Sequence, residues 1–195
     1  MTQLPGFAGG QVPALSEAVA AIEAAAPFRH LSTPGGKQMS VAMTNCGAVG
    51  WVSDRRGYRY ERADPLTGRP WPAMPALFLE LAVRAAAAGG FANFAPEACL
   101  INRYVPGARM SLHSDLDERD AAAPIVSVSL GLPAVFLWGG AARADKPMKI
   151  PLFSGDVLVW GGPARRHFHG VQPLKDGEHP QLGRQRINLT FRKAL

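Results

Sequence analysis

The 195-residue sequence is poor in cysteine, in charged residues and in long hydrophobic runs, and each shortage excludes a class of protein. Its two cysteines, Cys46 and Cys99, form neither a Cys-x-x-Cys pair nor a disulfide framework, so we expect a protein of the reducing cytoplasm. No apolar run approaches the length of about 18 residues that a membrane helix needs, and the first residues lack the regions of a secretion signal. Charged residues make up 18% of the chain and hydrophobic residues 47%, which excludes a disordered chain. We therefore expect one folded domain, or a core with an extension, and no membrane partner.

The charge that is present is mostly positive. Lysine and arginine together number 21 against 15 acidic residues, which gives a formal net charge of +6. An excess of positive charge favours an anionic partner such as nucleic acid, although many basic proteins bind none.

Two segments have the apolar spacing of amphipathic helices, and the rest of the chain has the pattern of short strands. The helices are expected at residues 14–26 and 76–88, with Gly89 placed to end the second in the left-handed conformation. Between them, Met39, Val41 and Met43 alternate with small residues, which predicts a half-buried strand. Further strands are expected at 99–105, 109–114, 125–131, 134–138, 148–152, 156–160, 166–171 and 186–192. This pattern indicates a mainly β protein with flanking helices (α+β), with its strands in a jelly roll or barrel.

His113 and Asp115 form the first candidate site. Residues i and i+2 of an extended strand point to the same side, so these two side chains are directed at one point. A second histidine, either His167 or His169 from a distant segment, would complete a set of two histidines and one carboxylate. Such a set leaves one face of a metal open and is typical of non-haem Fe(II) oxygenases. On its own, His-x-Asp is a weak signal, because the tripeptide often arises by chance at a surface turn.

Polar residues alternate along two of the predicted strands. They are Arg186, Asn188, Thr190 and Arg192 on the last strand, and Asn102 and Tyr104 on an earlier one. An ordinary strand with one wet side gives the same pattern. Beside a candidate metal site, however, these faces fit a polar pocket in which two arginines hold a dicarboxylate through charge-assisted hydrogen bonds.

The segment from Trp51 to Tyr60 interleaves aromatic residues with arginines. Aromatic rings stack on bases and guanidinium groups contact phosphates, so this composition suits nucleic acid. The alternative is a hairpin whose aromatic residues cover the core and whose arginines are only solvated. The residues themselves leave both readings open.

Taken together, these stretches resemble the AlkB family of Fe(II)/2-oxoglutarate-dependent dioxygenases, which remove alkyl groups from damaged nucleobases. The resemblance extends from about residue 27 to the C-terminus. It is carried by Thr33-Pro34-Gly35-Gly36, Met39-Ser40-Val41-Ala42-Met43-Thr44-Asn45-Cys46-Gly47, Leu100-Ile101-Asn102-Arg103-Tyr104, His113-Ser114-Asp115-Leu116-Asp117-Glu118, the strand 125–133, His169-Gly170 and Arg186-Ile187-Asn188-Leu189-Thr190-Phe191-Arg192. It implies N-terminal helices with a nucleotide-recognition lid at residues 1–95. A double-stranded β-helix (jelly-roll) core would follow at residues 96–195, in one structural unit with them.

The resemblance also implies site residues, position by position. The catalytic residues and ligands of Fe(II) would be His113, Asp115 and His169. The residues that bind 2-oxoglutarate would be Asn102, Tyr104, Arg186, Asn188 and Arg192, with Arg186 on the distal carboxylate and Arg192 on the end nearer the metal. Dioxygen would be the second co-substrate. The residues that bind the nucleic acid would be Trp51, Tyr58, Tyr60, Asp117 and Arg143.

The implied reaction is oxidative demethylation of 1-methyladenine and 3-methylcytosine in DNA, preferably single-stranded, by a monomeric enzyme, with methylated RNA as a further candidate substrate. Two positions depart from the family pattern, because Lys37 stands where an aromatic residue is expected and Leu116 where a basic residue is more usual. The grip on the strand is therefore not carried over from the family. Two alternatives remain: a 2-oxoglutarate oxygenase acting on protein or small molecules, and a non-catalytic nucleic-acid-binding jelly roll.

Overall fold

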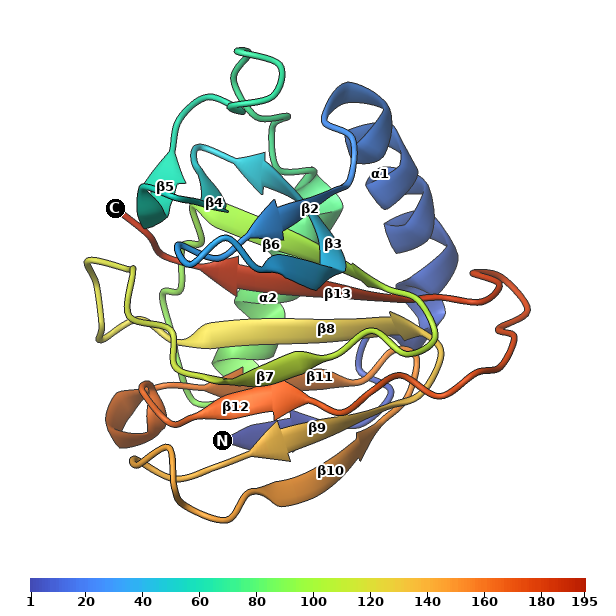
Figure 1. Ribbon diagram of the computed structural model, residues 1–195. Helices are drawn as coiled ribbons and strands as arrows, with labels where there is room; N and C mark the ends of the chain where they lie inside the picture. The colour runs from blue at the N-terminus through green and yellow to red at the C-terminus, as the bar shows by residue number, and fades with distance from the viewer.

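The computed structural model describes residues 1–195 and contains two β-sheets, a separate hairpin and two α-helices (Figure 1). The large sheet has the order β1-β11-β8-β13-β6-β3-β2, with β1 (Thr2–Leu4), β2 (Arg29–Ser32), β3 (Gln38–Gly47), β6 (Ala98–Tyr104), β8 (Ile125–Gly131), β11 (Val157–Trp160) and β13 (Arg186–Arg192). The small sheet has the order β10-β9-β12-β7, with β7 (Met110–His113), β9 (Ala134–Trp138), β10 (Met148–Leu152) and β12 (His169–Val171). The hairpin consists of β4 (Gly50–Asp54) and β5 (Gly57–Glu61). The predicted mainly β fold with two helices is confirmed.

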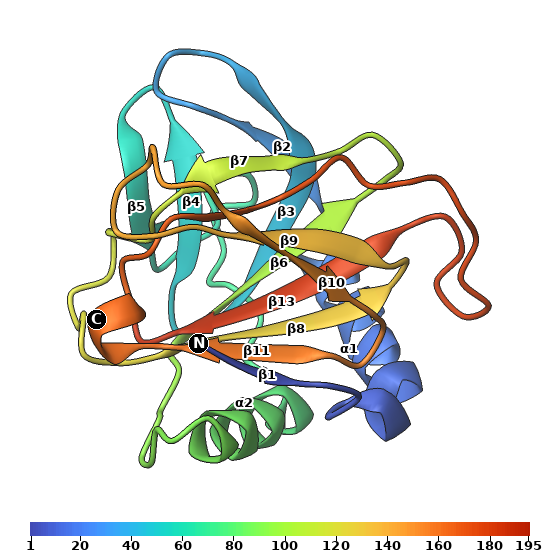
Figure 2. The same cartoon turned by 90° about the horizontal axis from the view of Figure 1, so that it is seen from below.

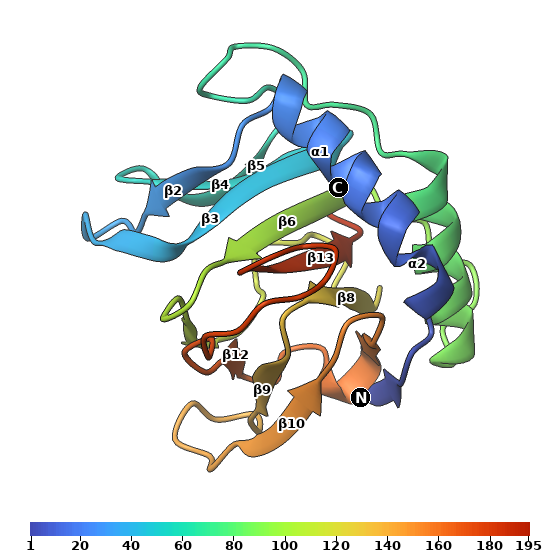
Figure 3. The ribbon, with the colours of Figure 1, turned by 90° about the vertical axis from the view of Figure 1, so that its right-hand side faces the viewer.

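The molecule has three layers, seen from the side in Figure 3. Helices α1 (Val12–Ala25) and α2 (Ala76–Ala88) cover one face of the large sheet, and the small sheet lies against its other face. A cluster of 23 buried hydrophobic residues joins the helices to the large sheet, and a second cluster of 15 lies largely between the two sheets. Strand β13 supplies Leu189 and Phe191 to the first cluster and turns its polar residues the other way. The polar face of the large sheet therefore lies inside the molecule, where a pocket forms.

Prolines lie at both ends of α1 and before the start of α2. Helix α1 has Pro13 in its first turn, where a missing N–H leaves no hydrogen bond unmade, and it ends just before Pro27. Its buried residues Leu15, Val19 and Ile22 recur at helical spacing and face the large sheet. Helix α2 follows Pro75 and runs along the large sheet near the edge strand β1 (Figure 2).

The end of α2 differs from the prediction. Gly89 has a φ of −80°, and it is Gly90, at +91°, that adopts the left-handed conformation. A Cβ atom on Gly89 would lie 2.6 Å from Cγ1 of Val159 on β11. Glycine is therefore needed at position 89 for close packing and at position 90 for the turn of the backbone.

The prediction of a half-buried strand at residues 39–44 is wrong for most of its length. From Val41 to Cys46 every residue of β3 is buried, whichever way its side chain points. Strand β3 lies between β6 and β2 in the large sheet. Thr44, on the face expected to be wet, donates its hydroxyl to the carbonyl oxygen of Ala26 just after α1.

Two predicted strands are shorter in the structure. The strand expected at 109–114 is β7, which ends at His113, so that Asp115 lies on the following loop. The strand expected at 166–171 is the three-residue β12, preceded by a single 3₁₀ turn at Gly162–Ala164. The loops before β12 and after β7 contact each other, because the hydroxyl of Ser114 donates to the backbone oxygen of Arg166.

Residues 1–95 and 96–195 share the large sheet, because β3 pairs with β6 and β1 pairs with β11. The hairpin β4–β5 stands apart as a two-stranded sheet beside β2 and β3 (Figure 1). No helix in the structure is long and apolar enough to cross a membrane.

Candidate active site

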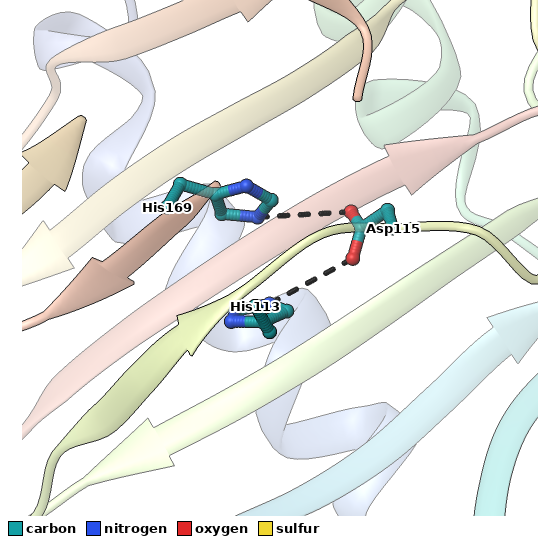
Figure 4. Close-up of side chains that lie close together, drawn as sticks. All are labelled: His113, Asp115 and His169. Atoms are coloured by element: carbon teal, nitrogen blue, oxygen red, sulfur yellow. Dashed lines mark ion pairs between the residues drawn. The ribbon is translucent and has the colours of Figure 1, made fainter. Parts of the chain in front are cut away.

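The three predicted metal ligands lie together where the small sheet meets the loop after β7. His113 ends β7, Asp115 follows it, and His169 is paired directly with His113 in the register of β12 and β7. The three side chains are turned toward one another (Figure 4). Nε2 of His113 lies 3.7 Å from Oδ1 of Asp115, and Nε2 of His169 lies 3.8 Å from Oδ2. All three ligand atoms lie within 4.8 Å of one another.

This donor set fits a metal ion. The Nδ1–H of His113 donates to the carbonyl oxygen of Ser111 at 2.9 Å, and that of His169 to the carbonyl oxygen of His167 at 3.1 Å. Because Nδ1 carries the proton in each ring, Nε2 keeps the lone pair that faces Asp115. Two imidazole nitrogens and one carboxylate oxygen are the set that non-haem Fe(II) oxygenases use.

Burial and neighbouring charges shift the pKa values of His169 and Asp115 toward the protonation states that bind a metal. Burial lowers the pKa of His169 from 6.5 to about 4, with the charge of His113 as the second cause, so the ring is neutral at pH 7. Burial alone would raise the pKa of Asp115. The positive charge of Arg192, followed by those of the two histidines, outweighs burial and leaves that pKa below its ordinary value. The carboxylate is therefore ionised.

An aromatic wall holds the ring of His169. Trp160 lies edge-on with its centroid 5.1 Å from that of His169, and Phe136 stacks at 5.9 Å with 26° between the planes. Trp138 packs against both aromatic residues. These rings fix the imidazole and line the metal site with apolar surface.

The cavity beside the triad contains most of the predicted co-substrate residues. It is lined by His113 and His169, and by Asn102, Tyr104, Asn188 and Arg192. Strands β6 and β13 bring these polar residues together, because Asn102 and Asn188 are direct partners in their register. Asn188 is held by Ser127 and the carbonyl oxygen of Val128, while Oδ1 of Asn102 is buried without a hydrogen-bond partner.

Arg186 lies beside Tyr104, which lines the cavity, but is not itself one of the lining residues. It is 1% exposed and forms no ion pair, and its guanidinium lies 5.0 Å from the ring centroid of Tyr104. Nη2 donates to the hydroxyl of Ser129 at 2.9 Å, but Nε and Nη1 have no partner. A buried cation without a counter-charge is costly, by several kcal/mol even after the surroundings relax. These free donors fit a carboxylate of 2-oxoglutarate.

Arg192 contacts a metal ligand directly. Its Nε and Nη2 donate to Oδ2 of Asp115 at 3.0 and 2.8 Å, and its Nε lies 3.3 Å from Oε1 of Glu118. The contact with Asp115 was not predicted from the sequence. The assignment of Arg192 to the near carboxylate of 2-oxoglutarate stays a prediction, and its place in the wall of the cavity is compatible with it.

The hairpin β4–β5 brings three of the predicted substrate residues to the loop that carries Asp115. The rings of Trp51 and Tyr58 stack with centroids 5.5 Å apart and 14° between their planes. The indole Nε1 of Trp51 donates to Oδ2 of Asp117 at 2.7 Å. Tyr60, directly opposite Trp51 in the hairpin, donates its hydroxyl to Oε1 of Glu118 at 2.6 Å. Trp51 and Tyr58 thus present aromatic surface, while the hydroxyl of Tyr60 is engaged with the loop.

Two candidate residues lie outside this group. Arg143 is exposed on the loop between β9 and β10 and forms no hydrogen bond or ion pair. His167 stacks on Trp138 at 5.3 Å, and its Nδ1–H donates to the carbonyl oxygen of Gly139 at 3.2 Å. His169, and not His167, completes the metal-binding group.

Sequence reasoning missed Glu118 and Arg165. Arg165 is 3% exposed and donates to Glu118, to the backbone oxygen of Asp115 and to that of Ala123. Glu118 stands in the same acidic run as Asp115 and Asp117, a signal that could have been used. Arg165 lies in a loop and has no periodic pattern that would have identified it.

Comparison with known proteins gives the family of the chain. Residues 1–192 match the family model of the 2OG-Fe(II) oxygenase superfamily. The alpha-ketoglutarate-dependent dioxygenase AlkB of Salmonella typhimurium is 55% identical over 188 residues, which cover 96% of this chain and 87% of that protein. The protein of the same name from Escherichia coli is 59% identical over 168 residues, covering 86% and 78%.

A solved structure supports the same assignment. OsALKBH1 superposes with a TM-score of 0.83 at 28% identity, over 98% of this chain and 96% of that one. The superposition covers nearly all of both chains, and the match to the Salmonella protein extends over 96% of this chain. The chain therefore belongs to the AlkB family within the 2OG-Fe(II) oxygenase superfamily, and it is an Fe(II)/2-oxoglutarate-dependent dioxygenase.

Proposed function

We propose that this dioxygenase removes methyl groups from ring nitrogens of nucleobases, chiefly 1-methyladenine and 3-methylcytosine in single-stranded DNA. Formaldehyde, succinate and carbon dioxide would be the products, and the restored base would remain in the strand. We further propose that the enzyme acts as a monomer in the cytoplasm, where two buried, unpaired cysteines stay reduced. RNA with the same lesions is a second substrate class to be tested.

The observation that carries this proposal is the arrangement of Trp51, Tyr58 and Asp117. Asp117 is two residues from the ligand Asp115 and is exposed, and Trp51 approaches it from the hairpin. A base methylated at N1 of adenine or N3 of cytosine is positively charged. Aromatic faces and a carboxylate both attract such a cation, whereas an unmethylated base gains only the stacking.

Different residues of the chain would bind the metal, bind the co-substrate and exclude water. His113, Asp115 and His169 would hold Fe(II) on one face and leave the other face for reactants. Bound Fe(II), with 2-oxoglutarate and dioxygen, supplies the oxidation that converts the N-methyl group to N-hydroxymethyl, which then leaves as formaldehyde. Arg186 would bind the distal carboxylate of 2-oxoglutarate through its free donors. The aromatic wall beside His169 would exclude water from the reacting atoms.

Single strands are the expected substrate because a base inside a duplex cannot reach the triad without flipping out. Methylation at a pairing nitrogen lowers the cost of flipping, since the damaged base is already unpaired. Arg55 and Arg56 are exposed at the turn of the hairpin, where they would contact phosphates without reading sequence. The net charge of +6 favours the same partner.

The test is mass spectrometry of oligonucleotides that contain one 1-methyladenine or one 3-methylcytosine, incubated with Fe(II), 2-oxoglutarate and oxygen. We expect loss of one methyl group per lesion with equal amounts of succinate, faster for single-stranded DNA than for the matched duplex. An unmethylated oligonucleotide and the Asp115→Ala variant serve as controls. Succinate formation that responds to a peptide or small molecule, but not to methylated DNA or RNA, would contradict the proposal. Sedimentation of the purified protein tests the monomer.

A further inference from the structure

We infer that Glu118 is a positioning residue that connects the β4–β5 hairpin to the metal ligand Asp115, so that docking of the hairpin and binding of the metal favour each other. The inference deepens the proposed function and rests on it in one respect, namely that the triad binds a divalent metal. It does not depend on which nucleic acid is the substrate.

The hairpin side of the connection consists of two cross-strand neighbours. Trp51 and Tyr60 are directly opposite each other in the hairpin, and they donate to two consecutive carboxylates, Asp117 and Glu118. These carboxylates follow Asp115 on the same loop. Asp117 is exposed and would have to turn toward a bound base, whereas the side chain of Glu118 is only 3% exposed. The bond between Tyr60 and Glu118 is therefore the attachment of the hairpin to the ligand loop that a bound base would leave in place.

The metal side of the connection consists of two arginines. Oε2 of Glu118 lies 2.9 Å from Nη2 of Arg165, and Oε1 lies 3.3 Å from Nε of Arg192. Arg192 then donates two hydrogen bonds to Oδ2 of Asp115, and Arg165 donates to the backbone oxygen of Asp115. Both the carboxylate and the backbone of the ligand are thus held by groups that Glu118 holds in turn.

The negative charge of Glu118 balances the two arginines that contact Asp115. The four side chains Asp115, Glu118, Arg165 and Arg192 are each at most 9% exposed, and their formal charges add to zero. Without the charge of Glu118, two buried arginines would face Asp115 alone. Arg192 would then compete with the metal for the same carboxylate, and the extra positive charge would repel a divalent cation. Glu118 therefore leaves Asp115 available to the metal.

Coupling between the two sides must be reciprocal. If docking of Tyr60 onto Glu118 favours the arrangement that binds metal, then metal binding favours docking by the same factor. We therefore expect a bound metal to slow the hydrogen exchange of the backbone amides of the hairpin. Neither the metal ligands nor the aromatic face of Trp51 needs to change for this effect.

The test compares four variants by Mn(II) affinity and by hydrogen exchange of residues 50–61, without 2-oxoglutarate or nucleic acid. Glu118→Gln removes the charge at nearly constant shape. Tyr60→Phe removes only the hydroxyl that reaches Glu118. Ser53→Ala is the matched control, because Ser53 ties the same hairpin to the backbone oxygen of Ser32 and not to the ligand loop. Mn(II) serves as the probe because it binds the same ligand set without reacting with oxygen.

We expect Glu118→Gln to weaken Mn(II) binding by about tenfold to a hundredfold, the usual range for a residue that orients a metal ligand. Mn(II) should slow exchange of the hairpin in the wild type and in Ser53→Ala, but not in Tyr60→Phe. Glu118→Asp keeps the charge, so it should recover most of the Mn(II) affinity, and it covers the case in which Glu118→Gln does not fold. Wild-type Mn(II) affinity in folded Glu118→Gln, or a hairpin whose exchange ignores Mn(II), would overturn the inference. A wild-type chain that binds no Mn(II) would instead overturn the proposed function.

Discussion

Single buried charges determine the chemistry of this pocket, and Arg186 is the one that lacks an acidic partner. Replacing Arg186 with Ala removes the fixed partner of the distal carboxylate, and we expect a loss of about 2–5 kcal/mol in binding of 2-oxoglutarate. That loss corresponds to about thirtyfold or more in affinity. Arg186→Lys should recover only part of it, since an ammonium group lacks the fork of a guanidinium. Calorimetric titration of the Mn(II)-loaded protein with 2-oxoglutarate measures both variants.

Arg184 provides the control for this prediction. It lies two residues earlier, is exposed, and pairs with Asp176 at the surface. Arg184→Ala should bind 2-oxoglutarate as the wild type does. If Arg186→Ala did so too, the carboxylate would have to be held elsewhere.

The two histidines before and within β12 should behave differently. His169→Ala should abolish turnover and sharply weaken Mn(II) binding, because two ligands do not hold a labile divalent ion. His167→Ala should keep most of both, since His167 contacts Trp138 and Gly139 and lies outside the triad. Electron paramagnetic resonance of free Mn(II) gives the affinity of each variant. The opposite result would move the ligand to position 167 and change the geometry of the whole site.

At the scale of elements, the hairpin β4–β5 should affect the nucleic acid and leave the co-substrate alone. Trp51→Ala removes a stacking surface worth about 1–3 kcal/mol per base, so the KM for methylated oligonucleotide should rise about fivefold to a hundredfold. Affinity for 2-oxoglutarate should stay nearly unchanged, because Trp51 does not line that cavity. Phe153→Ala, which removes another exposed aromatic residue at the turn after β10, should change neither quantity. Equal weakening of DNA and 2-oxoglutarate binding by Trp51→Ala would show that the two sites are not separate.

The ion pair between Arg29 and Asp64 holds the loop after β5. The loop after β5 is fastened by Asp64, whose side chain is 1% exposed and forms two hydrogen bonds with Arg29, one of them 3.0 Å long. Burial alone would raise the pKa of Asp64, but the bonds from Arg29 and from the N–H of Leu66 outweigh it and leave the pKa below 3.8. The folded state therefore binds this proton more weakly than the unfolded state does.

Asp64→Asn should lower the free energy of unfolding at pH 7 by about 2 kcal/mol. This is less than the 3–5 kcal/mol of a fully buried pair, because Arg29 keeps some contact with solvent. Since the pKa is depressed in the folded state, the stabilisation is complete above the unfolded-state pKa of about 4 and is lost as the pH falls from there through the lower folded-state pKa. Urea unfolding at several pH values should thus show a wild-type advantage that is constant above about pH 5 and shrinks below pH 4. Asp176 pairs with Arg184 at the exposed surface, so Asp176→Asn should unfold with the same free energy as the wild type at every pH.

At the scale of the whole molecule, the ligands should stabilise the fold by joining its two sheets. The triad lies on β7, on the loop after β7 and on β12. The predicted co-substrate residues lie on β6 and β13 of the large sheet. A ligand present at a hundred times its Kd adds about 2.7 kcal/mol to the free energy of unfolding. For a chain of this size we expect Mn(II) with 2-oxoglutarate to raise Tm by about 5–10 °C over the protein in a chelator. The rise should be absent in His169→Ala, and its absence in the wild type would argue against binding between the sheets.

The sequence by itself determined the features that repeat at short range. Alternation along β13 assigned Arg186 and Asn188 to one face and Leu189 to the other, and the structure has them so. The spacing of His113 and Asp115 also indicated a shared ligand site, and the two side chains do meet, although β7 ends at His113 and Asp115 lies on the loop after it. The two helices followed from their 3.6-residue period and their flanking prolines. Resemblance to a family then added the role of His169.

Only the tertiary structure determined which distant groups meet. No local pattern shows that both faces of β3 are covered, because one face packs toward α1 and the other, with Val41 and Met43, packs into the second hydrophobic cluster. The meeting of Glu118 with Tyr60, Arg165 and Arg192 depends in the same way on two loops, the strand β13 and a hairpin that come together around Asp115. Periodicity reports which side of an element is polar, but the register and packing of separate elements decide its partner. The metal ligands could therefore be predicted from the sequence, and the residues that position them could not.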